Sequence, residues 1–310
     1  MLDWPAAASS AAVVGSQGFL GRALTAALRA TGVHVLEFTR DRPCLTSTGI
    51  DAGLMAADSV FWAVSTINPA LAEAAPERVR ADHTLFEAVL NGLSVGDGRR
   101  RVVLLSSGGT VYDPAARPPY PESAAVSPLG AYGRAKLDME AMLAESSGAL
   151  GSGVSVRISN AYGPGQPVAP GQGVIAHWLA AAADGRALTM LGNPATTRDY
   201  VYVGDVAQAL VAIHQHTGIL PGTLNVGSGR PTTLAELADI IIAVVDDPAV
   251  TLEMAPGRSF DVARTWLDSS LARRVLAWSP RTSLDQGVQQ AWSALRSARP
   301  ERTDASRERA

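Results

Sequence analysis

A short glycine-rich turn between a buried apolar run and an amphipathic segment constrains the fold of this chain more than any other feature. The apolar run Ala11–Val14 ends in Gly15-Ser-Gln-Gly18-Phe-Leu-Gly21. Leucines then recur every four residues from Leu20 to Leu28, the spacing of one helix face, and Gly32 follows as a helix stop. In a strand–turn–helix unit of this kind, backbone N–H groups at the helix N-terminus can approach a pyrophosphate. The sequence therefore predicts a dinucleotide-binding unit near its N-terminus.

Strand-length apolar runs alternate with helical patterns through the first half of the chain. This alternation predicts right-handed crossovers and a doubly wound parallel α/β sheet of the Rossmann type. In the second half, a Gly/Pro loop over 162–172 precedes patterns of irregular spacing, and a capping box at Thr233–Glu236 opens a helix through Val245. The further expected strands are Val33–Phe38, Val60–Val64, Val102–Leu105 and Val154–Ser159, and the expected helices lie near Arg78–Leu90 and Ala131–Glu145.

These patterns predict two units. We expect a Rossmann domain over 1–160, to which 201–218 return, and a smaller α/β C-terminal substrate lobe over 161–200 and 219–296. From residue 297 to 310 the chain alternates Arg, Glu and Asp with small residues and has no apolar periodicity, so a disordered tail is expected there.

Composition excludes several classes of protein. The 310 residues carry a formal net charge of −3, which does not suggest a nucleic acid or an anionic membrane as partner. The single cysteine, Cys44, excludes an intrachain disulfide framework and a Cys-rich metal site, and no metal is expected. Since no apolar run has the length of a membrane span and the N-terminus does not resemble a secretory signal, we expect a cytoplasmic protein.

The end of the second strand selects between the two nicotinamide dinucleotides. An acidic residue there would hold the free ribose diol of NAD, but the expected position is Thr39, followed by Arg40. A hydroxyl and a guanidinium suit the 2′-phosphate of NADP better, so this pair favours NADP. The alternative, in which Glu37 or Asp41 holds the diol of NAD, stays open.

A tyrosine and a lysine occur four residues apart in Tyr132-Gly-Arg-Ala-Lys136, which places them on one helix face. Lys136 is the only lysine in a chain that otherwise uses arginine. A neighbouring ammonium group stabilises a phenolate, so we expect Lys136 to lower the pKa of Tyr132.

With these motifs in order, the chain resembles the extended short-chain dehydrogenases/reductases, and within them the sugar-nucleotide epimerases. The resemblance runs from about Ala11 to Trp292. It rests on the glycine turn, the Tyr-x-x-x-Lys pair and the segments Ser106-Ser-Gly-Gly-Thr-Val-Tyr112, Arg157-x-x-Asn160-x-Tyr-Gly-Pro164, Arg198-Asp-Tyr-Val-Tyr-Val203, Asp205-Val-Ala207, Asn225-Val-Gly-Ser-Gly229 and Leu276-Ala-Trp-Ser-Pro280.

The resemblance implies a role for each matching residue. Tyr132 and Lys136 are the catalytic pair and also contact the cofactor, and a Ser or Thr completes the set. Ser107, which precedes a Gly-Gly pair, is the candidate for that third residue, with Thr110 in reserve. The residues implied in cofactor binding are Gly15, Gln17, Gly18, Phe19, Leu20, Gly21, Thr39, Arg40, Val64 and Ser65.

For the substrate, the resemblance implies a nucleoside-diphosphate sugar. Asn160 would meet the diphosphate, Arg258 would bind phosphate and Asp261 the nucleoside ribose, with Arg198 as a second phosphate ligand. A homodimer is expected from the family alone. One departure is Asp82, which stands where many relatives have asparagine.

The implied reaction is oxidation at C4 of the hexose through a transient 4-keto intermediate, most simply a 4-epimerisation. The alternative is an NADPH-dependent 4-ketoreductase acting on a deoxysugar, and a remoter one is a non-catalytic dinucleotide sensor. Dehydratases and decarboxylases of the family carry acidic residues where this chain has Gly109 and Thr110, which disfavours elimination. Cys44 lies far upstream and His177 is expected to pack, so epimerisation at two carbons is not expected.

Overall fold

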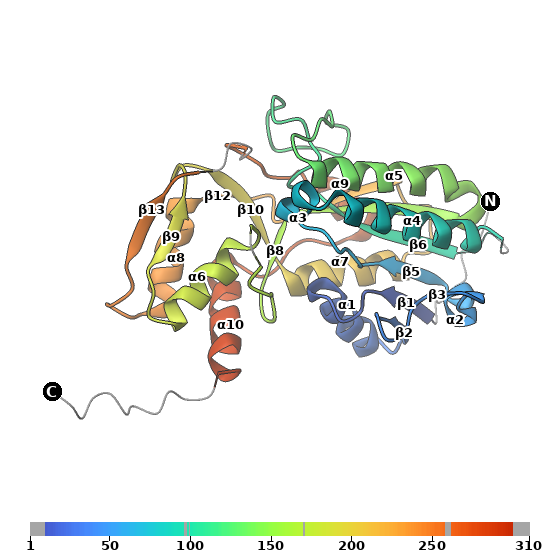
Figure 1. Ribbon diagram of the computed structural model, residues 1–310, viewed down its shortest axis with the longest axis horizontal. Helices are drawn as coiled ribbons and strands as arrows, with labels where there is room; N and C mark the ends of the chain where they lie inside the picture. The colour runs from blue at the N-terminus through green and yellow to red at the C-terminus, as the bar shows by residue number, and fades with distance from the viewer. Residues whose placement is uncertain (1–9, 96–97, 99, 170, 258–261, 300–310) are drawn as a thin grey trace.

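A parallel sheet organises the larger part of the molecule. The computed structural model describes residues 10–95, 98, 100–169, 171–257 and 262–299. Within this part of the chain the sheet has six strands in the order β11-β7-β6-β5-β1-β2, all parallel (Figure 1). Their carboxyl ends therefore meet at one edge, where ligands bind in open α/β sheets. The strands are β1 (Ser10–Val14), β2 (His34–Phe38), β5 (Ser59–Trp62), β6 (Arg100–Ser107), β7 (Gly151–Ile158) and β11 (Thr223–Val226).

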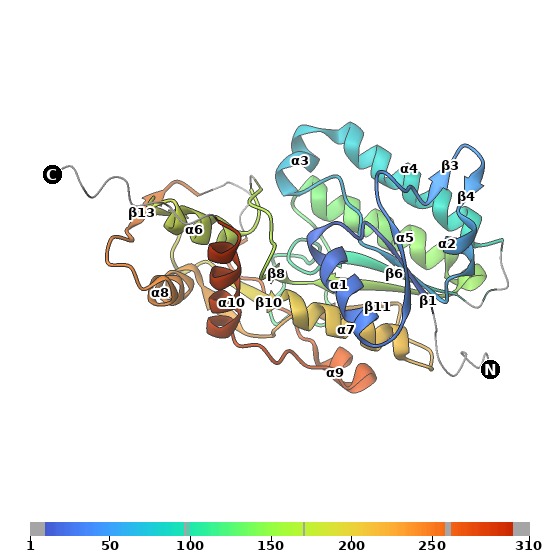
Figure 2. The ribbon, with the colours of Figure 1, turned by 90° about the horizontal axis from the view of Figure 1, so that it is seen from below.

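Helices cover both faces of this sheet because its strands are apolar on both sides. In β1, Ala11 and Val13 join one buried cluster whereas Ala12 and Val14 join another, as the two-residue period of a strand requires. One face carries α1 (Phe19–Ala30), α7 (Val203–Gln215) and α9 (Ser270–Leu276), and the other carries α2 (Ala52–Ala56), α3 (Pro69–Ala74), α4 (Pro76–Leu93) and α5 (Ala131–Leu150), with the hairpin β3 (Leu45–Thr46) and β4 (Gly49–Ile50) beside α2 and α4 (Figure 2).

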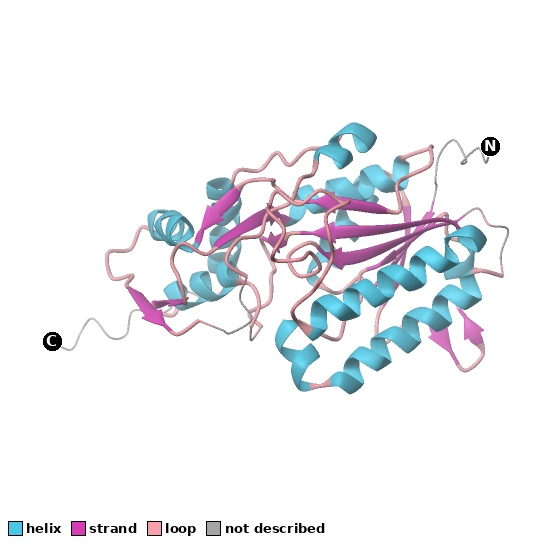
Figure 3. Cartoon of the chain, turned by 90° about the horizontal axis from the view of Figure 1, so that it is seen from above, coloured by secondary structure: helices cyan, strands magenta, loops and turns pink. Residues whose placement is uncertain are grey.

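A smaller lobe lies beyond the carboxyl edge of the sheet, on the left in Figures 1 and 3. Its core contains Trp178 and Trp292, both buried, packed with the apolar faces of three helices. The lobe is formed by the strands β8 (Asn160–Tyr162), β9 (Leu188–Leu191), β10 (Thr197–Tyr202), β12 (Pro231–Thr233) and β13 (Leu252–Ala255) and by the helices α6 (Val174–Ala183), α8 (Leu234–Val245) and α10 (Leu284–Ser297).

The fold class predicted from the sequence is confirmed, and the predicted strands and helices of the first half are present with ends shifted by a few residues. The capping box opens α8 as predicted: Thr233 accepts the Glu236 N–H while the Glu236 carboxylate accepts the Thr233 N–H. No helix in the described ranges is long and apolar enough to cross a membrane.

The boundary expected at residue 219 differs from the structure. β11 pairs with β7 as the edge strand of the large sheet, and α9 packs against β11, so both belong structurally to the larger unit. Hydrogen bonds to β7, which is far away in sequence, decide where this short strand lies. At the other end, α10 continues to Ser297, and residues 300–310 of the expected tail lie outside the described residues.

Candidate active site

The glycine turn has a geometry that only glycine permits at two of its positions. Gly15 has a φ of +89°, and a Cβ there would lie 2.7 Å from the backbone nitrogen of Val64. A Cβ on Gly21 would lie 2.1 Å from the carbonyl oxygen of Gly15. The close packing of turn, helix and neighbouring strand end therefore depends on both residues.

The N-terminus of α1 fits an anion. Gly18 is the N-cap of α1 and offers no side-chain cap, and the first turn carries no acidic residue. The N–H groups of that turn are therefore available, and the helix dipole favours negative charge there. These residues fit the pyrophosphate of a dinucleotide, with Phe19 and Leu20 lining the cavity described below. Gln17 is exposed at the start of the turn.

The end of β2 lies against the glycine turn, because the N–H groups of Gly15 and Ser16 both donate to the carbonyl oxygen of Phe38. Thr39 begins a tight turn in which its hydroxyl accepts the N–H of Arg42 at 3.2 Å. Arg40 and Asp41 are exposed beyond it. Glu37, one of the two acidic alternatives, is instead paired with Arg29 on α1.

The catalytic candidates gather in one cavity of about 570 Å³ between the sheet edge and the lobe. Ser107, Thr110 and Tyr132 all line it, and the Thr110 hydroxyl donates to the Ser107 hydroxyl at 2.9 Å. The start of α5 lies close to the loop that follows β6 and carries Thr110, since a Cβ on Gly133 would be 2.3 Å from the Thr110 carbonyl oxygen. Sequence and structure both leave Ser107 and Thr110 as partners for Tyr132.

Lys136 is buried behind Tyr132, with its ammonium nitrogen 5.6 Å from the centre of the tyrosine ring and 3.5 Å from the carbonyl oxygen of Leu105. Burial lowers the pKa of Lys136 to about 8, against the raising influence of Asp82 and Glu140.

The pKa predicted for Tyr132 is wrong in direction for the protein alone. Burial, reinforced by the negative charge of Asp82, raises the pKa of Tyr132 to about 12. Lys136 does not counteract this rise, because its own pKa of about 8 means that it has lost its charge before the phenol titrates. Without a ligand, Tyr132 is thus a neutral phenol at physiological pH.

Two of the substrate-binding candidates line the same cavity. Asn160, at the start of β8, donates its amide to the carbonyl oxygen of Asp199 at 2.9 Å. Arg198 donates to the carbonyl oxygen of Val262 at 2.6 Å. The buried carboxylate of Asp199 fixes this region by accepting the N–H groups of Ser228 and Leu267 at 2.8 and 3.2 Å. The other two candidates, Arg258 and Asp261, lie outside the described residues.

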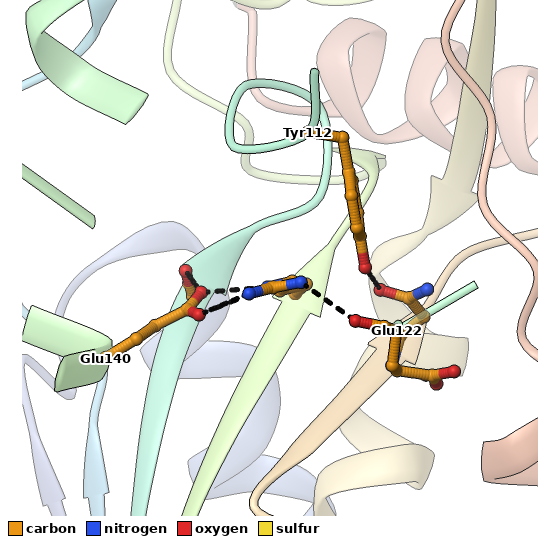
Figure 4. Close-up of polar contacts among 6 residues, drawn as sticks. Tyr112, Glu122 and Glu140 are labelled. Atoms are coloured by element: carbon orange, nitrogen blue, oxygen red, sulfur yellow. Dashed lines mark hydrogen bonds and ion pairs between the residues drawn. The ribbon is translucent and has the colours of Figure 1, made fainter. Parts of the chain in front are cut away.

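A buried ion pair joins α5 to β7 behind Lys136, and it is not among the site residues predicted from the sequence. The Arg157 guanidinium on β7 donates to the Glu140 carboxylate on α5 at 2.7 Å, and the Ser106 hydroxyl donates to the same carboxylate at 2.5 Å. Figure 4 shows Glu140 at one end of this network and Tyr112 with Glu122 at the other. The available signal was spacing: Glu140 follows Lys136 by four residues, on the same helix face.

The geometry can be compared with known proteins. Residues 11–227 match the model of the NAD dependent epimerase/dehydratase family. The chain belongs to this family, within the extended short-chain dehydrogenase/reductase group. The glycine turn, the Tyr132–Lys136 pair and most of the residues that line the cavity thus lie in the part of the chain that the family model covers.

Several relatives are similar over different lengths. UDP-glucose 4-epimerase of Mycolicibacterium smegmatis is 35% identical over 192 residues, which are 62% of this chain and 61% of that protein, so the match spans less than two thirds of the relative. dTDP-6-deoxy-L-talose 4-dehydrogenase (NAD(P)(+)) of Kitasatospora kifunensis is 29% identical over 93% of this chain and 96% of its own length. The solved UDP-glucose 4-epimerase of Thermotoga maritima has a TM-score of 0.82 at 24% identity, covering 93% of this chain and 99% of that one, and shows the shared fold.

The described residues also show where groups suited to other chemistry lie. No group of three or more His, Cys, Asp or Glu side chains placed to hold a metal ion occurs among them. Cys44 is buried in the apolar cluster between the sheet and the helices α2, α4 and α5. His177 lines the cavity, but its ring nitrogen Nε2 lies 2.7 Å from the carbonyl oxygen of Ala169.

Proposed function

We propose that this protein is a nucleoside-diphosphate-sugar 4-epimerase, which oxidises C4 of a hexose and reduces it from the opposite face. The observation that carries the proposal is the meeting of Ser107, Thr110 and Tyr132 in one cavity with Asn160 and Arg198. Reacting groups lie at the sheet edge, next to the glycine turn, and phosphate-binding side chains lie on the lobe side. The names of the similar proteins are consistent with a nucleotide sugar as substrate.

The proposed chemistry divides between the chain and its cofactor. A bound nicotinamide ring would accept the C4 hydride and return it. Tyr132 must be the phenolate to accept the proton of the 4-hydroxyl during oxidation, and the positive charges of Lys136 and of a bound oxidised nicotinamide would stabilise that phenolate. In reduction the neutral phenol returns the proton. Ser107, hydrogen-bonded by Thr110, donates to the substrate oxygen as charge develops on it, and Lys136 holds its positive charge beside the tyrosine.

The alternative function is an NADPH-dependent 4-ketoreductase of a nucleotide-activated deoxysugar. Two observations favour it. The exposed Arg40 next to Thr39 suits a 2′-phosphate, and Glu37 is engaged by Arg29 and therefore not aimed at a ribose. In addition, the raised pKa of Tyr132 makes it a proton donor, which is its role in reduction. In a non-catalytic sensor, by contrast, the Tyr132–Lys136 pair would have no function.

One experiment separates these functions. The purified protein is denatured, any released dinucleotide is identified by mass, and the native protein is assayed with UDP- and dTDP-hexoses and with their 4-keto forms. About one tightly held NAD per chain and interconversion of C4 epimers is the expected result for the epimerase, and it would overturn the preference for NADP inferred from Thr39 and Arg40. Release of NADP, or consumption of NADPH with a 4-keto sugar, would show that the protein is the reductase and not the epimerase. Tyr132→Phe is expected to lower turnover at least ~10³-fold with cofactor binding retained, whereas a sensor would keep its function.

The proposal extends to assembly and location. We place the enzyme in the cytoplasm as a homodimer that associates through helices of the dinucleotide-binding unit. Light scattering coupled to size exclusion measures the mass in solution, and a value near twice 32.2 kDa is expected. A mass of one chain at micromolar concentration would remove the dimer from the proposal.

A further inference from the structure

Asp82 is a buried carboxylate that the proposed reaction does not use. It lies on α4 and is only 8% exposed. One of its oxygens accepts the backbone N–H of Thr66 at 2.9 Å, and the other accepts the Thr66 hydroxyl at 2.8 Å. The Ser65 hydroxyl lies 3.5 Å away. Asp82 therefore holds the loop that follows β5, where the cofactor candidates Val64 and Ser65 lie.

The same stretch of α4 packs against the catalytic segment of α5. Val79 and Tyr132 flank one apolar cluster that contains Ala135. The ring nitrogen Nε2 of His83 lies 3.0 Å from the carbonyl oxygen of Ala135, directly before Lys136. Asp82 thus lies on the helix that holds the loop after β5 and also packs against the segment of α5 that carries the half-buried Tyr132 and the buried Lys136.

The charges around Lys136 come from three elements. Asp82 acts on it from α4, where the ring of the neighbouring His83 contacts the Ala135 carbonyl oxygen instead. Tyr132 and Glu140 share its helix, and Arg157 on β7 is paired with Glu140. Two carboxylates in this group act on Lys136. The charge of Glu140 is balanced by its ion pair with Arg157, whereas Asp82 has no such arginine partner among the described ion pairs. Its charge raises the pKa of both Tyr132 and Lys136.

We propose that Asp82 is a positioning residue that fixes the loop after β5 and supplies the counter-charge for the buried ammonium group of Lys136. Asparagine at this place could still accept the N–H of Thr66, but it would carry no charge. The catalytic consequence, a pH profile tuned by Asp82, rests on the proposed function. The electrostatic relation between Asp82 and Lys136 does not depend on which substrate is bound.

The test uses the fact that Lys136 is the only lysine in the sequence. Protein labelled with ¹³Cε-lysine, carrying no lysine in any added tag, has a single lysine signal, and its chemical shift is followed with pH. In the wild type the signal is expected to titrate with a pKa near 8. In Asp82→Asn the pKa is expected to fall by about one unit, because the negative charge that raises it has been removed.

Two control variants separate charge from packing. Thr66→Val removes one hydrogen bond to the carboxylate but leaves its charge, so the lysine titration is expected to stay within about 0.3 units of the wild type. Asp82→Glu keeps the negative charge, so the pKa of Lys136 is expected to stay close to that of the wild type. This variant remains informative if Asp82→Asn does not fold. An unchanged lysine pKa in Asp82→Asn, or equal shifts in Asp82→Asn and Thr66→Val, overturns the proposal.

Activity gives a second, separate readout. If the protein turns over a nucleotide sugar, the rate of sugar oxidation can be measured as a function of pH. In Asp82→Asn the acidic limb of that pH–rate profile is expected to move to lower pH, since the pKa of Tyr132 also falls. A profile that does not move while the lysine titration does would overturn the catalytic part. A lysine shift in a protein that acts on no sugar nucleotide would support the Asp82–Lys136 relation and refute the proposed function.

Discussion

Arg157→Met is expected to destabilise the protein by about 3–5 kcal/mol, since it leaves the Glu140 carboxylate buried without its guanidinium partner. The two side chains are 7% and 9% exposed, and they are joined by three hydrogen bonds in addition to the one from Ser106. The measurement is the free energy of unfolding in urea at neutral pH. A loss of this size is a large part of the stability of an ordinary domain.

The protein contains a matched control on its surface. Arg29 and Glu37 also form an ion pair, but their side chains are 55% and 35% exposed. Arg29→Met is therefore expected to cost less than about 1 kcal/mol, because water and salt screen the pair. The double variant Arg157→Met with Glu140→Gln removes both buried charges and is expected to recover part of the loss. Similar losses for Arg157→Met and Arg29→Met would contradict this account of the network.

The contact between Arg157 and Glu140 could not be predicted from the sequence. Arg157 and Glu140 lie on elements that are paired only by the tertiary fold, so nothing local indicates that the two charges meet. The contact between Asp82 and Thr66 is of the same kind. By contrast, the glycine turn and the Tyr132–Lys136 spacing are local patterns with one structural solution, and they were predictable from the residues themselves.

Two further predictions differ from the structure because tertiary contacts, and not local sequence, decide the outcome. β11 is a strand of four residues between glycine-flanked turns, too short for a periodicity signal, and its place is decided by pairing with β7. The pKa of Tyr132 was expected to fall because Lys136 is near it in sequence. Desolvation, which depends on everything packed around the ring, acts in the other direction and is the main cause of the raised pKa.

Lys136→Met is expected to abolish turnover and at the same time to stabilise the protein at pH 7. The folded-state pKa of Lys136 is about 8, against 10.5 for the free side chain. Below pH 8 both the folded and unfolded states carry the proton, and the folded state bears the full penalty of burying the charge, about 3 kcal/mol. Between pH 8 and 10.5 the unfolded state binds more protons than the folded state, so the unfolding free energy attributable to this group rises with pH.

The comparison of two proteins at two pH values isolates this effect. At pH 7, methionine fills the site without a charge, and a gain of about 2 kcal/mol over the wild type is expected, because the loss of the hydrogen bond from Lys136 to the Leu105 carbonyl oxygen offsets part of the penalty. At pH 9.5 the wild type has recovered about 2 kcal/mol and the difference is expected to be small. A methionine variant that is less stable at pH 7, or a difference that does not change with pH, would contradict a lowered lysine pKa. Lys136 thus lowers the stability of the protein at neutral pH. Its presence is explained by function, because it places a positive charge beside Tyr132.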